Sequence, residues 1–163
     1  MKYALIGCGR IAVNHIKAAL NNRLEIVAVC DVLPEKMDAL LAKYDLAGDP
    51  SIKRYTDYRQ MLSENELTLV SIATESGLHA QIALDCIDAG VNVIIEKPMA
   101  MSMADAEEII RRSDARGSQS GRLPPESLQR GGAGDPPSPW RRGGSAALPR
   151  IHPCALEPQP GLL

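Results

Sequence analysis

Short apolar runs alternate with amphipathic stretches through the first two thirds of the chain. Four runs are apolar almost throughout and predict strands buried on both faces, and a shorter run predicts one more strand; they are YALIG, LEIVAVCD, LTLVSIAT, VNVIIEK and RYTDY. Between and after them apolar residues recur at helical spacing, which predicts helices over RIAVNHIKAALNN, LPEKMDALLAKYD, YRQMLSEN, SGLHAQIALDCIDAG and SMADAEEIIRRSDARG. This alternation predicts the α/β class: a doubly wound parallel sheet of the Rossmann type, which binds ligands at the carboxyl ends of its strands.

The composition of the chain changes at Gly117. Residues 117–163 hold nine of the twelve prolines and eight of the thirteen glycines, and they are poor in large apolar residues. Such a segment cannot offset its ordering entropy by burial. We therefore expect a folded domain over residues 1–116 and a disordered tail rich in Pro, Gly and Arg over residues 117–163.

Charge and cysteine content exclude several classes of protein. The formal net charge is -2, which does not favour binding to nucleic acid or to an anionic membrane surface. No apolar run approaches the roughly 20 residues that span a bilayer. Cys8, Cys30, Cys86 and Cys154 have no metal-binding spacing. We expect reduced thiols in a cytoplasmic protein that has no metal, nucleic-acid or membrane partner.

A glycine motif, Gly7-Cys8-Gly9-Arg10-Ile11-Ala12, lies between the first predicted strand and the first predicted helix. Gly7 permits the sharp turn, and Gly9 lets the backbone approach a pyrophosphate bound at the helix N-terminus. Asp31 ends the second strand, where a carboxylate accepts hydrogen bonds from the adenosine ribose and repels a 2′-phosphate. The motif therefore predicts a site for NAD rather than NADP. The alternative is an ordinary glycine turn followed by an aspartate that caps a helix.

A polar segment follows the fourth predicted strand, at the sheet edge where a nicotinamide ribose would pass. It contains Thr74 and Ser76, and His79 lies on the first turn of the next predicted helix. On the pattern alone, an ordinary helix cap with a surface histidine is the favoured interpretation of these three residues.

The sequence EKPMA ends the fifth predicted strand. It places Glu96 and Lys97 at the carboxyl edge of the sheet, and Pro98 restricts Lys97 to an extended conformation after which the peptide bond can be cis. A lysine held in this way can hydrogen-bond a substrate hydroxyl and stabilise the charge that develops during hydride transfer. The alternative is a solvated strand end with an ion pair.

In this order, the segments IGCGRIA, VAVCD, VSIATESGLHA and EKPMA resemble the Gfo/Idh/MocA family of NAD(P)-dependent oxidoreductases, which act mostly on sugars and their derivatives. The resemblance covers residues 1–116, and EKP is its most specific part. It implies that NAD is held by Gly7, Gly9, Arg10, Ile11, Asp31, Thr74, His79, Glu96 and Lys97. It also implies that Lys97 contributes to catalysis. Family members often carry Pro-Asn after the threonine, where this chain has Glu75-Ser76.

Members of this family continue into a sixth strand and a C-terminal domain that faces the substrate and supplies a catalytic histidine. Residues 117–163 match neither, and we interpret them as family sequence translated in a shifted, GC-rich frame. With permitted codons, a one-base shift of 123–130 gives Cys-His-Gln-Asn-Arg-Phe-Asn, and 156–162 can give Trp-Asn-Arg-Asn-Pro-Gly-Tyr. Both shifted-frame peptides resemble motifs of one branch of the family, which is similar to nucleotide-sugar uronate dehydrogenases. The alternative is a natural disordered tail or linker.

The expected function is NAD-dependent hydride transfer between nicotinamide and a hydroxyl or ketone of a sugar or nucleotide sugar. Since the wall that holds the substrate would be missing, we expect weak NAD binding and little or no turnover. The fifth strand would also form an apolar sheet edge. Two alternatives stay open: a non-catalytic NAD-binding module, and a Rossmann-like scaffold that binds no cofactor. The resemblance implies a small-molecule sugar partner and oligomers in the family.

Overall fold

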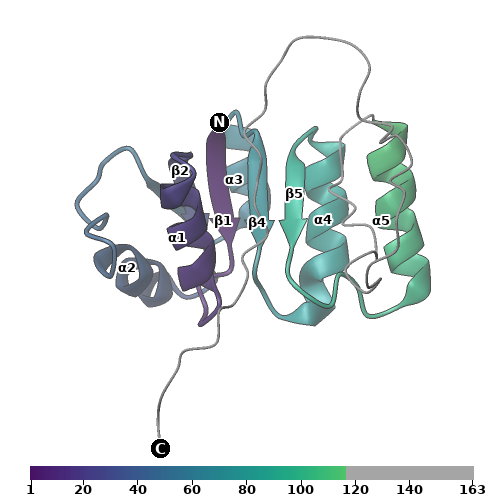
Figure 1. Cartoon of the computed structure of the whole chain (residues 1–163), viewed down its shortest axis with the longest axis horizontal. Helices are drawn as coiled ribbons and strands as arrows, with labels where there is room; N and C mark the ends of the chain where they lie inside the picture. Colours follow the sequence, from purple (N-terminus) through teal and green to yellow (C-terminus); the bar gives the residue numbers. More distant parts are fainter. Residues whose placement is uncertain (117–163) are drawn as a thin grey trace, which may run out of the picture. The chain divides into compact units, whose positions relative to one another are not determined.

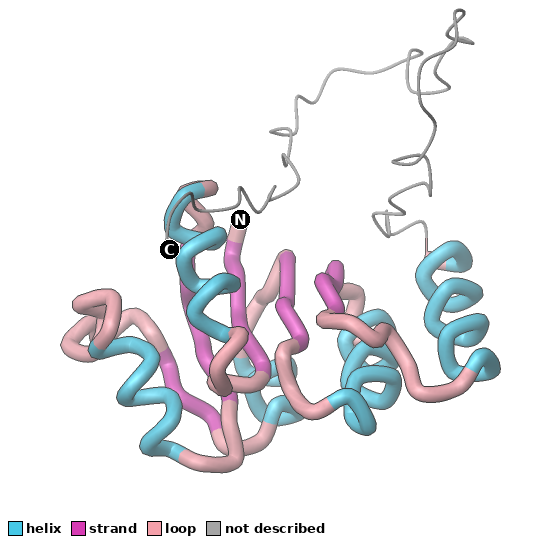
Figure 2. Tube along the Cα trace, turned by 60° about the horizontal axis from the view of Figure 1, so that its bottom comes forward, coloured by secondary structure: helices cyan, strands magenta, loops and turns pink. Residues whose placement is uncertain are grey.

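The computed structural model describes residues 1–116, in which helices flank a parallel sheet (Figures 1 and 2). The strands are β1 (Lys2–Ile6), β2 (Glu25–Cys30), β3 (Lys53–Tyr55), β4 (Leu69–Ile72) and β5 (Asn92–Ile95). The helices are α1 (Ala12–Asn21), α2 (Pro34–Ala42), α3 (Tyr58–Glu64), the 3-10 turn η1 (Ser76–Leu78), α4 (His79–Asp88) and α5 (Met103–Ala115). The strand order is β3-β2-β1-β4-β5, and every neighbouring pair is parallel.

The predicted α/β class and the Rossmann-type sheet are confirmed. Every predicted strand and helix before Gly117 is present, including the short β3 and α3. One predicted helix starts differently: η1 turns first, and the α-helix begins only at His79. Ser102 caps α5, because its Oγ accepts a hydrogen bond from the N–H of Asp105 at 3.1 Å.

Successive residues of β1 face opposite sides of the sheet, and both sides are covered. Tyr3 and Leu5 pack in a core with residues of α1 and α2. Ala4 and Ile6 pack in a second core with residues of α3, α4 and α5. Because both faces of the strand are buried, its sequence is apolar throughout rather than alternating.

Burial decreases at β5, which is the edge of the sheet within residues 1–116. Val93 and Ile95 pack against the core beside α4. Ile94, whose side chain is on the opposite face, is 41% exposed. The tail and reading-frame predictions concern residues 117–163, which lie outside the described residues.

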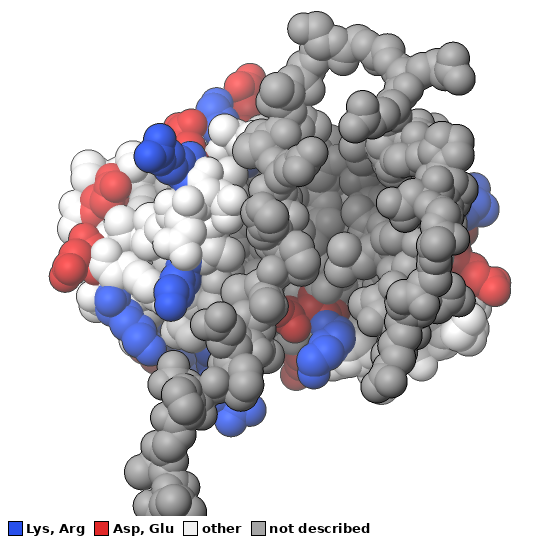
Figure 3. Space-filling model, viewed as in Figure 1, with Lys and Arg blue, Asp and Glu red and all other residues white. Residues whose placement is uncertain are grey.

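The described surface carries both signs of charge. In Figure 3, lysine and arginine side chains are interspersed with aspartate and glutamate around the visible part of the described residues. Among residues 1–116, no helix is long and apolar enough to cross a membrane.

Candidate functional site

The glycine turn between β1 and α1 packs directly against the end of β4. Gly7 has a φ of +93°, and a Cβ at this residue would lie 2.5 Å from the carbonyl carbon and oxygen of Ala73. Only glycine fits such a position without displacing the neighbouring backbone. Gly9 differs, because a Cβ there would meet no atom within 4 Å. The turn therefore needs Gly7 for its own packing, and Gly9 faces open space.

The turn also carries backbone donors without a partner among the described residues. The N–H of Gly7 donates to the carbonyl of Cys30 at 2.8 Å. Within residues 1–116, the N–H groups of Gly9, Arg10 and Ile11 have no hydrogen-bond partner. Free N–H groups at the start of a helix, together with the helix dipole, favour a bound anion.

Asp31 is held beside this turn by three hydrogen bonds to the backbone. Its Oδ2 accepts from the N–H of Cys8 at 2.8 Å, and its Oδ1 accepts from the N–H of Leu33 at 3.0 Å. Its own N–H donates to the carbonyl of Tyr55 at 3.1 Å. Asp31 lies two residues before Leu33, the N-cap residue of α2, and its bond goes to the N–H of Leu33 rather than to an N–H within the helix. Each carboxylate oxygen keeps a lone pair with which to accept from a ligand.

A cavity of about 620 Å³ opens beside Asp31 at the carboxyl ends of the strands. It has the size of a small-molecule site. Its lining includes the predicted residues Gly7, Gly9, Asp31 and Thr74. The sequence prediction missed the rest of the lining, notably Val32, Lys36, Tyr58, Arg59, Leu78 and Gln81.

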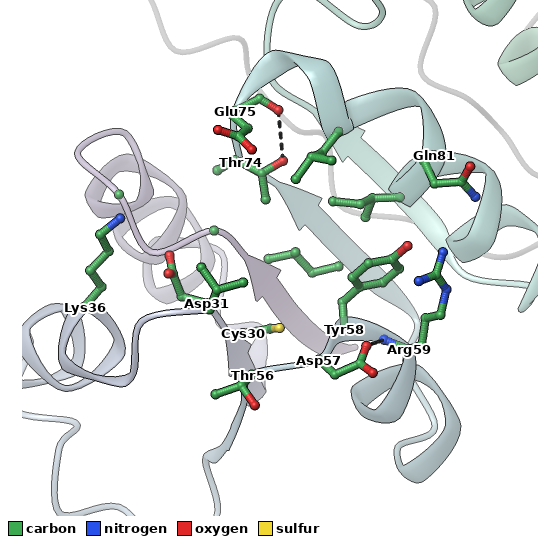
Figure 4. Close-up of a pocket in the computed structure, with 17 residues that line it drawn as sticks. Cys30, Asp31, Lys36, Thr56, Asp57, Tyr58, Arg59, Thr74, Glu75 and Gln81 are labelled. Atoms are coloured by element: carbon green, nitrogen blue, oxygen red, sulfur yellow. Dashed lines mark hydrogen bonds between the residues drawn. The ribbon is translucent and has the colours of Figure 1, made fainter.

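Three of these missed residues are a lysine and two exposed apolar side chains. Figure 4 shows the Lys36 side chain extending from α2 toward the glycine turn. Val32 is 77% exposed and Leu78 is 46% exposed, although both are large and apolar. Such exposed apolar side chains at a cavity are suited to contact a flat ring. Of the three, only Val32 lies in a predicted loop, between a predicted strand and a predicted helix; Lys36 and Leu78 lie in predicted helices.

The far wall of the cavity is organised by Asp85 of α4. Its carboxylate accepts hydrogen bonds from the Tyr58 hydroxyl at 2.7 Å, from Arg59 Nε at 3.0 Å and from Gln81 Nε2 at 2.9 Å. The Arg59 guanidinium also lies 4.9 Å from the Tyr58 ring centroid. Burial and the bond to Asp85 raise the pKa of Tyr58. This wall is therefore formed before any ligand binds.

The segment after β4 does not form the helix cap that was the favoured interpretation of the pattern. Neither η1 nor α4 has a side-chain cap, and Thr74 Oγ1 donates to the carbonyl of Glu75 at 3.3 Å. His79 is only 1% exposed rather than at the surface. Its Nδ1 lies 2.8 Å from the carbonyl oxygen of Pro98, and its Nε2 lies 3.0 Å from that of Thr74. Each ring nitrogen thus lies within hydrogen-bond distance of a backbone carbonyl oxygen.

The carboxylate of Glu96, at the end of β5, contacts a histidine rather than the Lys97 ammonium. Glu96 Oε1 lies 2.9 Å from Nε2 of His15 on α1, and Glu96 Oε2 accepts from the N–H of Lys97 at 3.3 Å. The Lys97–Pro98 peptide bond is cis. The Lys97 side chain is exposed, and within residues 1–116 its Nζ has no partner. His15 was not predicted; its place in the apolar stripe of α1 was the only signal.

The structure brings the predicted residues together in part. Gly7, Gly9, Asp31 and Thr74 line one cavity. The other predicted residues do not line it: Arg10, Ile11, His79, Glu96 and Lys97. The first two of these are exposed on the glycine turn, and the last three lie on or beneath the loops at the β4 and β5 ends.

The described cysteines, Cys8, Cys30 and Cys86, are free and buried. Burial raises the pKa of each thiol, Cys8, Cys30 and Cys86, to about 12. No group of residues in 1–116 could hold a metal ion. Cys154 lies outside the described residues.

Comparison with known proteins identifies the family of this chain. A family described as "Oxidoreductase family, NAD-binding Rossmann fold" matches residues 1–121. The D-apiose dehydrogenase of Paraburkholderia graminis is 34% identical over 117 residues, which are 71% of this chain and 30% of that protein. The inositol 2-dehydrogenase of Salmonella typhimurium is 29% identical over 119 residues, which are 72% of this chain and 34% of that protein.

A solved structure shows a similar fold. The WlbA dehydrogenase from Bordetella pertussis, in complex with NADH and UDP-GlcNAcA, aligns with a TM-score of 0.64 and 32% identity. The alignment covers 71% of this chain and 34% of that chain. The chain thus spans about a third of the length of the relatives it matches. It belongs to the Gfo/Idh/MocA family of oxidoreductases and carries the family's NAD-binding Rossmann fold.

Proposed function

We propose that this chain is the cofactor-binding part of an NAD-dependent dehydrogenase that transfers hydride between nicotinamide and a hydroxyl or ketone of a sugar or nucleotide sugar. The observation that carries the proposal is the position of Asp31. Its carboxylate is fixed by the N–H groups of Cys8 and Leu33, next to a glycine turn with free donors and at the edge of a cavity.

The adenosine half of NAD fits the cavity by chemistry as well as by size. Asp31 accepts hydrogen bonds from the ribose hydroxyls, and the free N–H groups of Gly9 and Arg10 bind the pyrophosphate. Val32 and Leu78 offer apolar surface to the adenine ring. The open space at Gly9 supports this fit, because a Cβ there would project toward the pyrophosphate.

The preference for NAD over NADP follows from the charge of Asp31. A carboxylate whose two oxygens are held by the backbone cannot turn away from a 2′-phosphate, and like charges repel. Lys36, which lines the same cavity, reduces this repulsion without removing it. We therefore propose NAD as the cofactor and a smaller residual affinity for NADP.

The nicotinamide half is proposed to lie toward Thr74, Glu96 and Lys97. NAD bound there supplies the hydride acceptor at C4 of its nicotinamide ring. The Nζ of Lys97, which is exposed and unpartnered within residues 1–116, hydrogen-bonds the substrate hydroxyl and stabilises the charge that develops on its oxygen. Glu96 is already paired with His15 and leaves Lys97 free for this role.

The relatives support a sugar-like substrate. The Bordetella pertussis structure contains NADH and UDP-GlcNAcA, and the myo-inositol dehydrogenase from Lactobacillus casei, 26% identical with a TM-score of 0.63, was solved with NAD(H) and myo-inositol. That alignment covers 71% of this chain and 33% of the Lactobacillus chain. We propose a polyol, sugar or nucleotide sugar as substrate. A cytoplasmic location stays a prediction.

A non-catalytic NAD-binding module is the second candidate. The observation that favours it is that Gly7, Gly9 and Asp31 line the cavity, whereas Lys97 is not among the described residues that line it. Such a module would bind NAD with the same residues and would show no hydride transfer. The two candidates share the cofactor site and differ only in the role of Lys97.

Titration of the chain with NADH, followed by nicotinamide fluorescence, tests the shared step. We expect saturable binding that Asp31→Ala weakens at least tenfold, whereas Glu35→Gln, an exposed charge change on the first turn of α2, leaves it unaltered. Absence of NADH binding would contradict both candidates. NADH formation with polyols and UDP-sugars, lost in Lys97→Ala while NADH binding is kept, would favour the dehydrogenase.

A further inference from the structure

Lys97 lies between two residues that are each held by a histidine from another part of the fold. The residue before it, Glu96, pairs through its carboxylate with Nε2 of His15 at 2.9 Å. The carbonyl of the residue after it, Pro98, lies 2.8 Å from Nδ1 of His79. One histidine comes from α1 and the other from the first turn of α4.

The sheet itself holds this segment weakly. Within residues 1–116, β5 pairs only with β4, and it ends at Ile95. The N–H of Glu96 still donates to the carbonyl of Ile72 at 3.0 Å, which is the last backbone bond from β4 to this strand end. Beyond it the chain turns away, so side-chain contacts must fix the direction in which Lys97 leaves the sheet.

Both histidines are well placed to do this. His79 is 1% exposed, and the side chain of His15 is also largely buried. Buried hydrogen bonds of this kind are retained because a lost partner leaves an unsatisfied polar group. Nε2 of His79 also lies 3.0 Å from the carbonyl oxygen of Thr74, so the ring lies between the loop after β4 and the loop after β5.

The protonation pattern of the rings decides whether the contacts are hydrogen bonds. A carbonyl oxygen only accepts, so the contact with Pro98 requires a proton on Nδ1 of His79. Likewise, the contact with the Glu96 carboxylate requires a proton on Nε2 of His15. A neutral ring has one N–H, so a His79 protonated only at Nε2 would bind Thr74 and release Pro98.

We propose that His15 and His79 are positioning residues for Lys97: they fix Glu96 and Pro98 on either side of it and leave its ammonium free. The inference deepens the proposed function, because it rests on Lys97 as the group that contacts substrate. The placement of Lys97 is nevertheless measurable in the chain without substrate or cofactor.

The first experiment observes Lys97 directly. The full chain is reductively methylated with ¹³C-formaldehyde, and the Lys97 dimethylamine signal is identified by its loss in Lys97→Arg. In His15→Leu, which cannot donate to Glu96, we expect this signal to shift and broaden. In His15→Gln, which keeps a donor, we expect the wild-type signal. Asn14→Leu, an exposed change in the same turn of α1, is the matched control and leaves the signal unchanged.

The second experiment measures the tautomer of His79 without mutating the buried ring. ¹⁵N-histidine spectra of the chain resolve His15, His79 and His152, and His15→Gln together with His152→Gln assigns them. We expect a proton on Nδ1 of His79 and on Nε2 of His15. A His79 ring protonated at Nε2 alone would overturn its part in the proposal.

An unaltered Lys97 signal in a folded His15→Leu variant would overturn the part of His15. Both measurements are made without NAD, so they stand apart from the NADH titration. If NADH fails to bind while the spectra behave as expected, the proposed function fails and the placement of Lys97 by the two histidines stands. If NADH binds and the spectra differ from those expected, the proposed function stands and the placement of Lys97 by the two histidines fails.

Discussion

The backbone N–H of Cys8 donates a hydrogen bond to Oδ2 of Asp31 at 2.8 Å. This bond joins the glycine turn, where a pyrophosphate is proposed to bind, to the carboxylate that is proposed to bind the adenosine ribose. The two halves of the site are thus fixed relative to one another before a ligand arrives. Such preorganisation reduces the entropy that binding must offset.

Removing the acceptor at Asp31 should weaken NAD binding. A hydrogen bond to a charged group contributes about 1.5–3 kcal/mol, so we expect Asp31→Ala to raise the Kd for NADH by about 10- to 100-fold. Asp31→Asn should also weaken binding, because an amide cannot accept from both Cys8 and Leu33. Fluorescence titration measures the effect, and an unchanged Kd in either variant would argue against a ribose site.

Cofactor preference should shift when the carboxylate is removed and Lys36 is kept. We expect Asp31→Ser to bind NADPH more tightly than the wild-type chain does, because the repulsion of a 2′-phosphate is lost and the Lys36 ammonium borders the cavity. Adding Lys36→Ala to this variant should remove most of the gain in NADPH affinity. Parallel titrations with NADH and NADPH give the ratio of affinities, and equal ratios in all three chains would contradict this assignment.

The two glycines of the turn should respond oppositely to alanine. Gly7→Ala places a Cβ 2.5 Å from Ala73 backbone atoms at a φ of +93°, so we expect a loss of at least about 2 kcal/mol in the free energy of unfolding. Gly9→Ala meets no protein atom, so stability should hold while NADH binding falls. Urea unfolding and titration of both variants check this; a stable Gly7→Ala would show that the turn can rearrange.

The buried thiols should resist alkylation in the folded chain. Burial raises the pKa of Cys8, Cys30 and Cys86 to about 12 from 9.0, which lowers the thiolate fraction by about 10³ at neutral pH. We expect iodoacetamide to modify them slowly in buffer and rapidly in concentrated guanidinium chloride. Peptide mass spectrometry follows each site, and rapid labelling of Cys86 in buffer would show that the core beside α4 opens.

Acid should release the ion pairs of α5. Hydrogen bonds from Arg111 and Arg112 lower the pKa of Glu108 to about 2 from 4.5. Because the folded-state pKa is depressed, the stabilisation is present above pH 4.5 and is lost as the pH falls toward 2. We expect the thermal midpoint of Glu108→Gln to depend less on pH across this window than that of the wild-type chain. Glu107→Gln, a neighbouring exposed change, should keep the wild-type slope.

The sequence by itself determined the fold class, the glycine turn and the place of Asp31. These features are encoded locally: a strand buried on both faces is an apolar run, a turn with positive φ needs glycine, and a strand end fixes the residue that follows it. The same kind of local sequence pattern predicted Lys97 at the end of β5.

The tertiary structure decided which residues meet. His15 reaches Glu96 across 81 positions of the chain, and His79 reaches Pro98, because the strand order brings β1, β4 and β5 side by side. Neither histidine could be assigned from its neighbours in sequence, and a surface position was the favoured expectation for His79. Burial and partners depend on the order of the strands, which local patterns do not encode.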